Sequence, residues 1–169
     1  MKAAHLFFLC LLSAVVYGQK NKAETPYLAY FNQKPDSLDP IEGIWNVSSV
    51  QEFYRYDTLY DVLNYSKAGR FAIMKKDGKY QSLDLSGGDY KVEFTNTDVK
   101  GVYLYRSFFK ETNEFSKAQA VISKAGEMEY TYDFPQNYLK VRFADSYEEG
   151  TRVTNRLLWT KSYPLSGSK

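Results

Sequence analysis

The sequence predicts an all-β protein, folded as an antiparallel up-and-down β-barrel of eight to ten strands. Short segments in which apolar and polar residues alternate recur from residue 43 to residue 163, turn-forming dipeptides separate them, and no convincing crossover helix interrupts them. Such a series of strands either leaves two exposed edges or closes on itself. A β-sandwich fits the same spacing, but the short connections favour pairing between sequence neighbours and therefore a barrel.

The first strand is predicted at Gly43–Val50, after a polar segment that ends at Pro40. Trp45 and Val47 fall on one face of this strand, because successive side chains of a strand point to opposite faces. We expect the indole of Trp45 to fill one end of the core.

The next segment, Gln51–Gly69, supports two interpretations. Thr58 and Asp61 have the spacing of a helix capping box, which predicts a short helix. The tyrosines of the same segment are typical of strands and argue against that helix. A short helix and a long irregular connection that closes one end of the barrel are equal alternatives here.

The remaining strands are easier to place. Asp77-Gly78 supports the positive φ angles of a tight hairpin turn, and Pro135 ends the clearest alternation in the chain. In the segment that follows Pro135, the side chains of Leu139, Val141 and Phe143 are expected to point inward. The predicted strands are Arg70–Lys75, Lys79–Leu85, Tyr90–Thr95, Gly101–Phe109, Phe115–Ser123, Glu127–Phe134, Tyr138–Ala144 and Thr151–Tyr163.

The first residues have the pattern of a secretory signal peptide. Met1–Gly18 carries a positive charge at Lys2 and an apolar stretch at Leu6–Val16, about eleven residues long. That stretch is shorter than the ~20 residues that a membrane-spanning helix needs. Cleavage near Gly18 predicts a secreted or periplasmic protein without a transmembrane segment.

After the signal peptide at 1–18, the chain divides into an N-terminal extension at 19–39, the barrel domain at 40–164 and a tail at 165–169. The extension is polar, contains Pro26 and has no apolar period, so it is predicted to be a tether or a strap. A single domain of this length buries a sufficient core without disulfides.

Removal of the signal peptide removes His5 and Cys10, the only histidine and the only cysteine of the chain. The mature chain then has no imidazole and no thiol, which excludes cysteine nucleophiles, Ser-His triads and zinc sites built from Cys or His. No metal or other cofactor is predicted. Without Lys2 the mature chain has 21 basic and 20 acidic residues, and this balance disfavours a nucleic-acid-binding protein.

Carboxylates supply the remaining enzymatic hypothesis. Glu127 and Glu129 share one face of a predicted strand, and two carboxylates about 5–10 Å apart can catalyse glycoside hydrolysis. Alternating glutamates are, however, typical of the solvent-exposed face of a strand. No catalytic pair is therefore assigned, and the protein is predicted not to be an enzyme.

The start of the first strand resembles that of lipocalin-like (calycin) barrels. These proteins open the strand with Gly-x-Trp, here Gly43-Ile44-Trp45, and pack a basic side chain of the last strand over the tryptophan. The resemblance implies that Arg156, with Arg152 as second choice, has this role and that Asp39–Pro164 forms the barrel. The chain departs from the family in lacking disulfides and the Thr-Asp-Tyr-type turn of its middle motif.

Two functions follow from such a barrel. Its interior can enclose one small, partly apolar ligand. The alternative is an interaction or structural domain of the cell envelope, in which inward side chains fill the barrel and exposed tyrosines such as Tyr103 and Tyr105 provide a contact surface. The predicted ligand-binding residues are Trp45, Phe94, Leu104, Tyr130, Tyr132 and Phe143.

Overall fold

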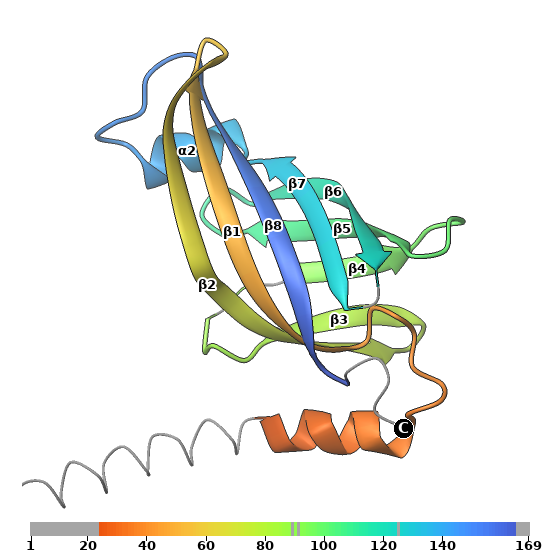
Figure 1. The fold of residues 1–169 in the computed structure, drawn as a ribbon. Helices are drawn as coiled ribbons and strands as arrows, with labels where there is room; N and C mark the ends of the chain where they lie inside the picture. The colour runs from red at the N-terminus through yellow and green to blue at the C-terminus, as the bar shows by residue number, and fades with distance from the viewer. Residues whose placement is uncertain (1–23, 89, 91, 125, 165–169) are drawn as a thin grey trace, which may run out of the picture. The chain divides into compact units, whose positions relative to one another are not determined.

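The computed structural model describes residues 24–88, 90, 92–124 and 126–164 (Figure 1). The predicted signal peptide and the tail at 165–169 lie outside the described residues. The chain separates into two compact units, one that ends at Ser37 and one that begins at Leu38.

In the first unit, residues 24–33 form a helix that the sequence does not predict. Pro26 is one of its residues. The helix ends shortly before Pro35, because a proline disfavours helical geometry in the residue that precedes it.

The second unit is a closed antiparallel barrel (Figure 1). Each strand pairs with its neighbours in the sequence, and β8 completes the circle by pairing with β1. This confirms the predicted fold class, with eight strands in up-and-down order. The strands are β1 (Gly43–Arg55), β2 (Thr58–Lys76), β3 (Lys79–Asp84), β4 (Val92–Asn96), β5 (Val102–Phe109), β6 (Glu114–Lys124), β7 (Glu127–Asp133) and β8 (Thr151–Tyr163).

The short helix and the irregular connection predicted for residues 51–69 are both wrong. β1 continues to Arg55, Tyr56 and Asp57 form a tight turn, and β2 begins at Thr58. The φ angles of the two turn residues are 46° and 64°, as in the turns that match the twist of a hairpin. The Asn-Gly or Asp-Gly signal of such turns is absent from the sequence here, so the hairpin was not predicted.

Three long strands, β1, β2 and β8, form an arm that extends past the ends of the shorter strands (Figure 1). β1 is paired along its length with β2 on one side and with β8 on the other. These ladders set the depth of each inward side chain in the barrel, because Trp45 lies opposite Phe71 of β2 and Lys161 of β8.

The strand predicted at Tyr138–Ala144 is also wrong, because Gln136–Arg142 forms the helix α2. Leu139 is fully buried, and Phe143, one turn later, packs against the same cluster, whereas Val141 is 57% exposed. Apolar residues at alternate positions fit a strand, but a subset of them spaced by four also fits a helix. The contacts under α2 decide between the two.

The buried apolar side chains form two clusters inside the barrel. The smaller one lies under α2 and contains Phe53, Leu139 and Val153. The larger one fills the end at which β1 begins. It contains Ile41, Trp45, Val47, Phe71, Ile73, Tyr80, Val92, Phe94, Tyr103, Tyr105, Ala120, Met128, Tyr130 and Trp159.

Gly43 provides a test of the closure. Its φ is 149°, and a Cβ atom there would lie 2.3 Å from the carbonyl oxygen of Tyr163 at the end of β8. We predict that Gly43→Ala lowers the free energy of unfolding by about 2 kcal/mol or more, since both the backbone conformation and the contact with β8 become strained. Chemical denaturation measures the change.

Gly78→Ala is the matched control for this prediction. Gly78 also has a positive φ, 76°, but an added Cβ would have no atom within 4 Å. The free energy of unfolding of this variant should fall by only about 1 kcal/mol, which is the cost of placing a residue with a Cβ in the left-handed conformation. Equal losses in the two variants would contradict a steric role of Gly43 in closing the barrel.

Candidate functional site in the barrel interior

Trp45 and the segment before β1 close one end of the barrel. Ile41 and Trp45 are fully buried, and the indole Nε1 of Trp45 donates a hydrogen bond to the carbonyl oxygen of Ile41 at 2.8 Å. Lys161 of β8 lies over the indole, with Nζ 4.8 Å from the ring centroid. The same Nζ donates to the carbonyl oxygens of Pro40 and Glu42 at 2.5 Å and 2.9 Å. Lys161 therefore ties the end of β8 to the start of β1.

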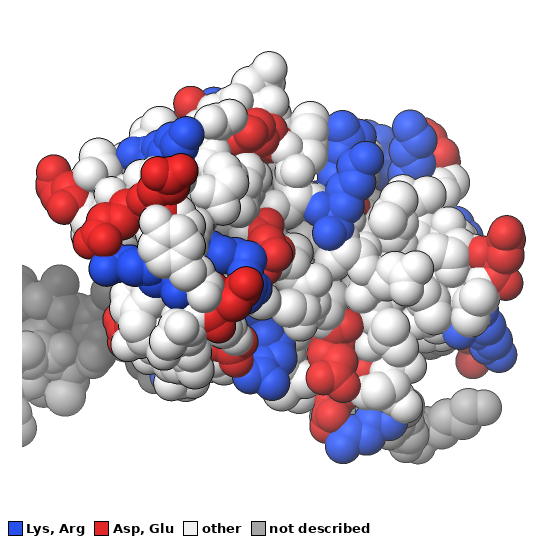
Figure 2. All heavy atoms as spheres, turned by 90° about the horizontal axis from the view of Figure 1, so that it is seen from above, with Lys and Arg blue, Asp and Glu red and all other residues white. Residues whose placement is uncertain are grey.

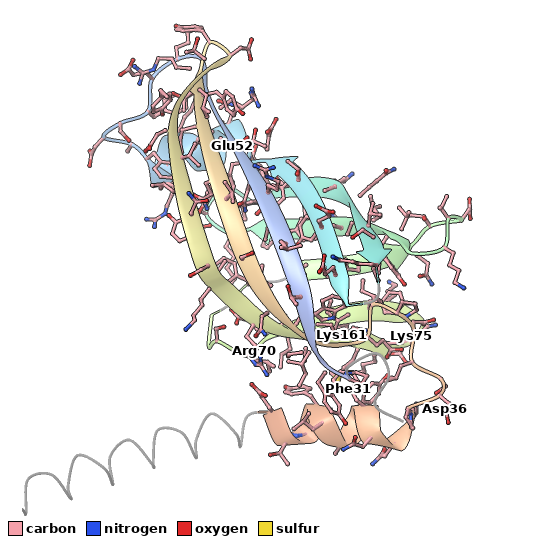
Figure 3. All side chains as sticks on the ribbon, viewed as in Figure 1. Phe31, Asp36, Glu52, Arg70, Lys75 and Lys161 are labelled. Atoms are coloured by element: carbon pink, nitrogen blue, oxygen red, sulfur yellow. The ribbon has the colours of Figure 1, made fainter. Side chains whose placement is uncertain are left out.

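Arg156, the predicted basic partner of Trp45, is placed elsewhere, and this prediction is wrong. Its guanidinium pairs with Glu52 at 2.9 Å, and Glu52 lies on the arm, far from Lys161 at the closed end (Figure 3). The second choice, Arg152, covers the ring of a tyrosine of β1. The register of β8 against β1 explains the difference, because it places Lys161 opposite Trp45. Lys161 is the basic side chain of the last strand that covers the tryptophan.

Two carboxylates fix the segment before β1 at this closed end. The buried carboxylate of Glu42 accepts hydrogen bonds from the backbone amides of Asp39, at 2.9 Å, and Lys75, at 3.0 Å. The carboxylate of Asp39 accepts from Lys75 Nζ at 2.8 Å and from the Tyr80 hydroxyl at 2.7 Å. These hydrogen bonds, first that of Lys75 and then that of Tyr80, lower the pKa of Asp39. Both carboxylates therefore hold the closed end together.

A layer of hydroxyl and amide groups belongs to the larger cluster and borders it. We call it the tyrosine layer and define it as Tyr105, Tyr130, Tyr132, Ser49 and Asn155. The alternation of β1, β5, β7 and β8 directs all five side chains inward. The rings of Tyr105 and Tyr130 are 4.1 Å apart, and those of Tyr105 and Tyr132 are 5.5 Å apart. Ser49 Oγ donates to Asn155 Oδ1 at 2.6 Å, and Asn155 Nδ2 donates to the Tyr132 hydroxyl at 3.0 Å.

Two buried polar atoms at this layer have no hydrogen-bond partner of acceptable geometry among the described residues. They are the hydroxyl oxygen of Tyr130 and the indole Nε1 of Trp159. The two residues are 4% and 1% exposed. Burial raises the pKa of Tyr130 and of Tyr132 well above the ordinary value of 10, so both hydroxyls stay protonated near neutral pH. The Tyr130 hydroxyl lies near the Trp159 Nε1 and the Tyr105 hydroxyl, which both affect its pKa, so these buried groups are close together but make no hydrogen bond of good geometry.

Four of the predicted ligand-binding residues lie inside the barrel. Trp45, Phe94 and Tyr130 belong to the larger cluster, and Tyr132 packs against it. The rings of Phe94 and Tyr130 are 6.3 Å apart and nearly perpendicular. Trp45 is at the closed end, whereas Tyr130 and Tyr132 belong to the tyrosine layer.

The other two predicted residues lie apart from this group. Leu104 is 41% exposed on the outer face of β5, so its prediction as a residue of the interior is wrong. Phe143 follows α2 and packs against Phe53, with their ring centroids 5.8 Å apart. It therefore belongs to the smaller cluster rather than to a common wall with Phe94.

Tyr103 and Tyr105 were predicted to form an exposed contact surface, and this is wrong. Their side chains are 4% and 2% exposed and point into the barrel. The register explains why they fit there, because Tyr103 lies opposite Ala120 and Tyr105 opposite Ala118 of β6. Small residues on one strand leave room for the large rings of the next.

Sequence reasoning missed three polar residues of the interior. Lys161 comes two residues after Trp159 and hence lies on the same face of β8, which is the signal that could have identified it. Ser49 continues the inward face of Trp45 on β1 in the same way. Asn155 lies on the inward face of β8, but nothing in the sequence indicates that it faces a serine of β1.

The outer surface offers a second, shallower feature. A half-open depression of about 210 Å³ is lined by Glu93, Arg106, Phe108 and Phe115, and the guanidinium carbon of Arg106 lies 3.7 Å from the ring centroid of Phe115. On the face shown in Figure 2, basic and acidic side chains of the described residues are interspersed. This mixture agrees with the small net charge of the chain, +2.

The described part of the chain contains no cluster of three or more His, Cys, Asp or Glu side chains suited to a metal ion. Among the same residues, no helix has the length and apolar character needed to cross a membrane.

The fold defines the protein as a closed, eight-stranded, antiparallel up-and-down barrel with an aromatic interior. Comparison of the chain with known protein families, with curated proteins and with solved structures found no match. Its function is therefore inferred from the barrel itself.

The ammonium group of Lys161 provides a pH-dependent test of the closed end. Burial lowers the pKa of Lys161 from 10.5 to about 8, against the opposing effect of Glu42. The unfolded chain binds this proton more tightly than the folded chain, so the free energy of unfolding should rise between about pH 8 and pH 10.5. We predict that, across this pH interval, the free energy of unfolding of the wild type rises by about 2 kcal/mol more than that of Lys161→Met.

Urea denaturation of both proteins at several pH values measures this difference. The buried tyrosines titrate in both proteins, so their contributions cancel in the comparison. Parallel stability curves for the wild type and Lys161→Met would show that the lysine is not held in the buried geometry described above.

Proposed function

We propose that the protein is an exported, non-enzymatic, lipocalin-like barrel that binds a small, partly apolar molecule at the tyrosine layer. The observation that carries this proposal is that the buried Tyr130 hydroxyl and Trp159 Nε1 make no hydrogen bond of good geometry, either with each other or with Tyr105. A buried polar group without a hydrogen bond costs about 1–3 kcal/mol. A bound molecule with an acceptor atom between the two donors would remove that cost.

The surroundings indicate the chemistry of the ligand. Aromatic rings such as those of Phe94 and Tyr105 form the wall and favour a flat apolar body. The donors favour a carbonyl, hydroxyl or ether oxygen on one side of that body. An eight-stranded barrel has space for only one small ligand besides its own side chains, so we expect a compact molecule rather than a long acyl chain.

The geometry of the two ends supports an entrance past α2. The end near Trp45 is held by the Lys161 hydrogen bonds and by the carboxylates of Asp39 and Glu42. α2 is a helix of seven residues whose one buried side chain is Leu139. Displacing a short helix costs fewer contacts than breaking the closed end.

Export and the lipocalin-like assignment are part of the same proposal. The signal-peptide pattern at 1–18 supports secretion or a periplasmic location. Gly43-Ile44-Trp45 at the start of β1 and the cover of Trp45 by Lys161 support the likeness to lipocalin-like barrels. The balanced set of exposed charges favours neither a nucleic-acid ligand nor an acidic surface partner.

A second candidate function is that of an interaction domain of the cell envelope. The observation in its favour is the set of large apolar residues that β2 leaves exposed on the arm. This function requires no ligand in the interior, so the experiments below distinguish it from ligand binding.

Native mass spectrometry of the protein purified from its own cells tests the proposal. We predict an additional small mass on the wild type and a lower occupancy in Tyr130→Phe, from an affinity about fivefold weaker, which corresponds to the loss of about 1 kcal/mol from one hydrogen bond. Tyr54→Phe is the matched control, because the Tyr54 hydroxyl donates to Glu52 on β1, away from the tyrosine layer. Its occupancy should equal that of the wild type.

A thermal denaturation experiment completes this test. If the interior is only a packed core, Tyr130→Phe removes a buried polar group that makes no hydrogen bond of good geometry and should stabilise the protein. A higher melting temperature of this variant, together with no bound mass on the wild type, would refute ligand binding.

A further inference from the structure

One edge of β2 has no strand beside it over most of its length. β1 pairs with β2 from Thr58 to Ile73, but β3 pairs only with Phe71–Lys76. Within the described residues of the barrel, no strand pairs with the other edge of residues 58–69. This part of β2 lies at the margin of the arm (Figure 1).

The free edge is apolar and exposed. All residues from Thr58 to Ala68 are exposed. A row of unpaired peptide groups with apolar side chains is a template for the addition of another strand. The large apolar residues of the segment, each between 38% and 49% exposed, are Leu59, Tyr60, Val62, Leu63 and Tyr65.

The direction of the free peptide groups can be derived from Asp61. The backbone N–H of Val62 donates to the carboxylate oxygen Oδ1 of Asp61 at 2.8 Å, which indicates that this amide faces the free edge and not β1. Because peptide groups alternate along a strand, those of Asn64 face the same edge. The stretch from Asp61 to Tyr65 pairs with β1 without a register shift, so it is the regular part of the edge.

We propose that this edge binds the same edge of a second copy of the chain, as an antiparallel pair around a two-fold axis at Asn64. Identical strands in antiparallel pairing are self-complementary, as a two-fold interface requires. The two Asn64 residues would exchange both backbone hydrogen bonds. Val62 would pair with Ser66 of the second copy, and its N–H would exchange the carboxylate of Asp61 for the carbonyl oxygen of that Ser66. The two barrels would then share one continuous sheet.

The charges of the segment select this register. Asp61 and Lys67 are the only charged residues between 58 and 69, and each is three positions from Asn64. Around an axis at Asn64, Asp61 lies opposite Lys67 of the second copy, and the symmetry creates this ion pair twice. An axis moved to Leu63 places Asp61 opposite Tyr65 instead and leaves both charges without an opposite charge.

The irregular parts of β2 limit the extent of the pairing. The ladder to β1 shifts register on both sides of the stretch from Asp61 to Tyr65, so the hydrogen-bonded part of the interface is short. Lys67 lies at one of these shifts, and its long side chain spans the irregularity. Such a short interface, with apolar side chains beside it, fits a weak and reversible dimer.

Charge reversal tests the proposal directly. Analytical ultracentrifugation over a range of protein concentrations should show a monomer–dimer equilibrium for the wild type. Asp61→Lys and Lys67→Asp should each weaken the dimer at least tenfold, because each places like charges opposite one another. The double variant D61K/K67D, and an equimolar mixture of the two single variants, should dimerise like the wild type.

Two further variants test whether dimerisation depends on this edge of β2 or only on the charge of the protein. Glu129→Lys reverses a charge on β7, which has a paired strand on both sides, and should leave the dimer unchanged. Val62→Pro removes an amide at the free edge and should abolish the dimer without unfolding the barrel, which circular dichroism checks. A wild type that stays monomeric at roughly 1 mM would overturn the proposal. A double variant that fails to restore the dimer would overturn the register at Asn64.

Discussion

The pairing of β8 with β1 is the constraint on which the rest of the structure depends. It converts an open meander with two exposed edges into a barrel with an enclosed interior. At the end of this seam, Lys161 covers Trp45 and donates to the carbonyl oxygens of the preceding segment. The β1–β8 pairing and the contact of Lys161 with Trp45 depend on each other. Without the pairing, the indole would lie on an open sheet. Without the lysine, the segment before β1 would lose its hydrogen bonds to β8.

Closure also determines the chemistry of the interior. The inward faces of β5 and β7 carry large rings, and on β6 the small residues Ala118 and Ala120 lie opposite the rings of β5. This complementarity fills much of the barrel with side chains, in the way expected of eight strands. The polar groups of the tyrosine layer are unusual in such a core, because buried hydroxyl and indole N–H groups normally make hydrogen bonds of good geometry, and those of Tyr130 and Trp159 do not. They distinguish this interior from a simply packed one and give the binding hypothesis its chemical content.

The unequal lengths of the strands explain why an edge of β2 is available for a second chain. The arm is longer than the barrel, and β3 covers only the end of β2. Residues 58–69 therefore have a partner on one side only. The proposed dimer uses this difference in strand length and leaves the interior unaffected. Ligand binding and self-association can consequently be tested, and can fail, independently.

By itself, the sequence determined the all-β class, the sequential order of the strands and the place of Trp45, because period-two alternation, turn residues and Gly43-Ile44-Trp45 are local signals. Tertiary structure alone decided which face of each strand is inside. Alternation defines two faces but not which one is buried, and tyrosine suits either, so Tyr105 and Leu104 were assigned to opposite sides from those they occupy. The helix α2 was missed because its apolar spacing also fits a strand. Lys161 was missed because a residue's cross-strand partner depends on the register between two segments more than a hundred residues apart, and that register is fixed only when the barrel closes.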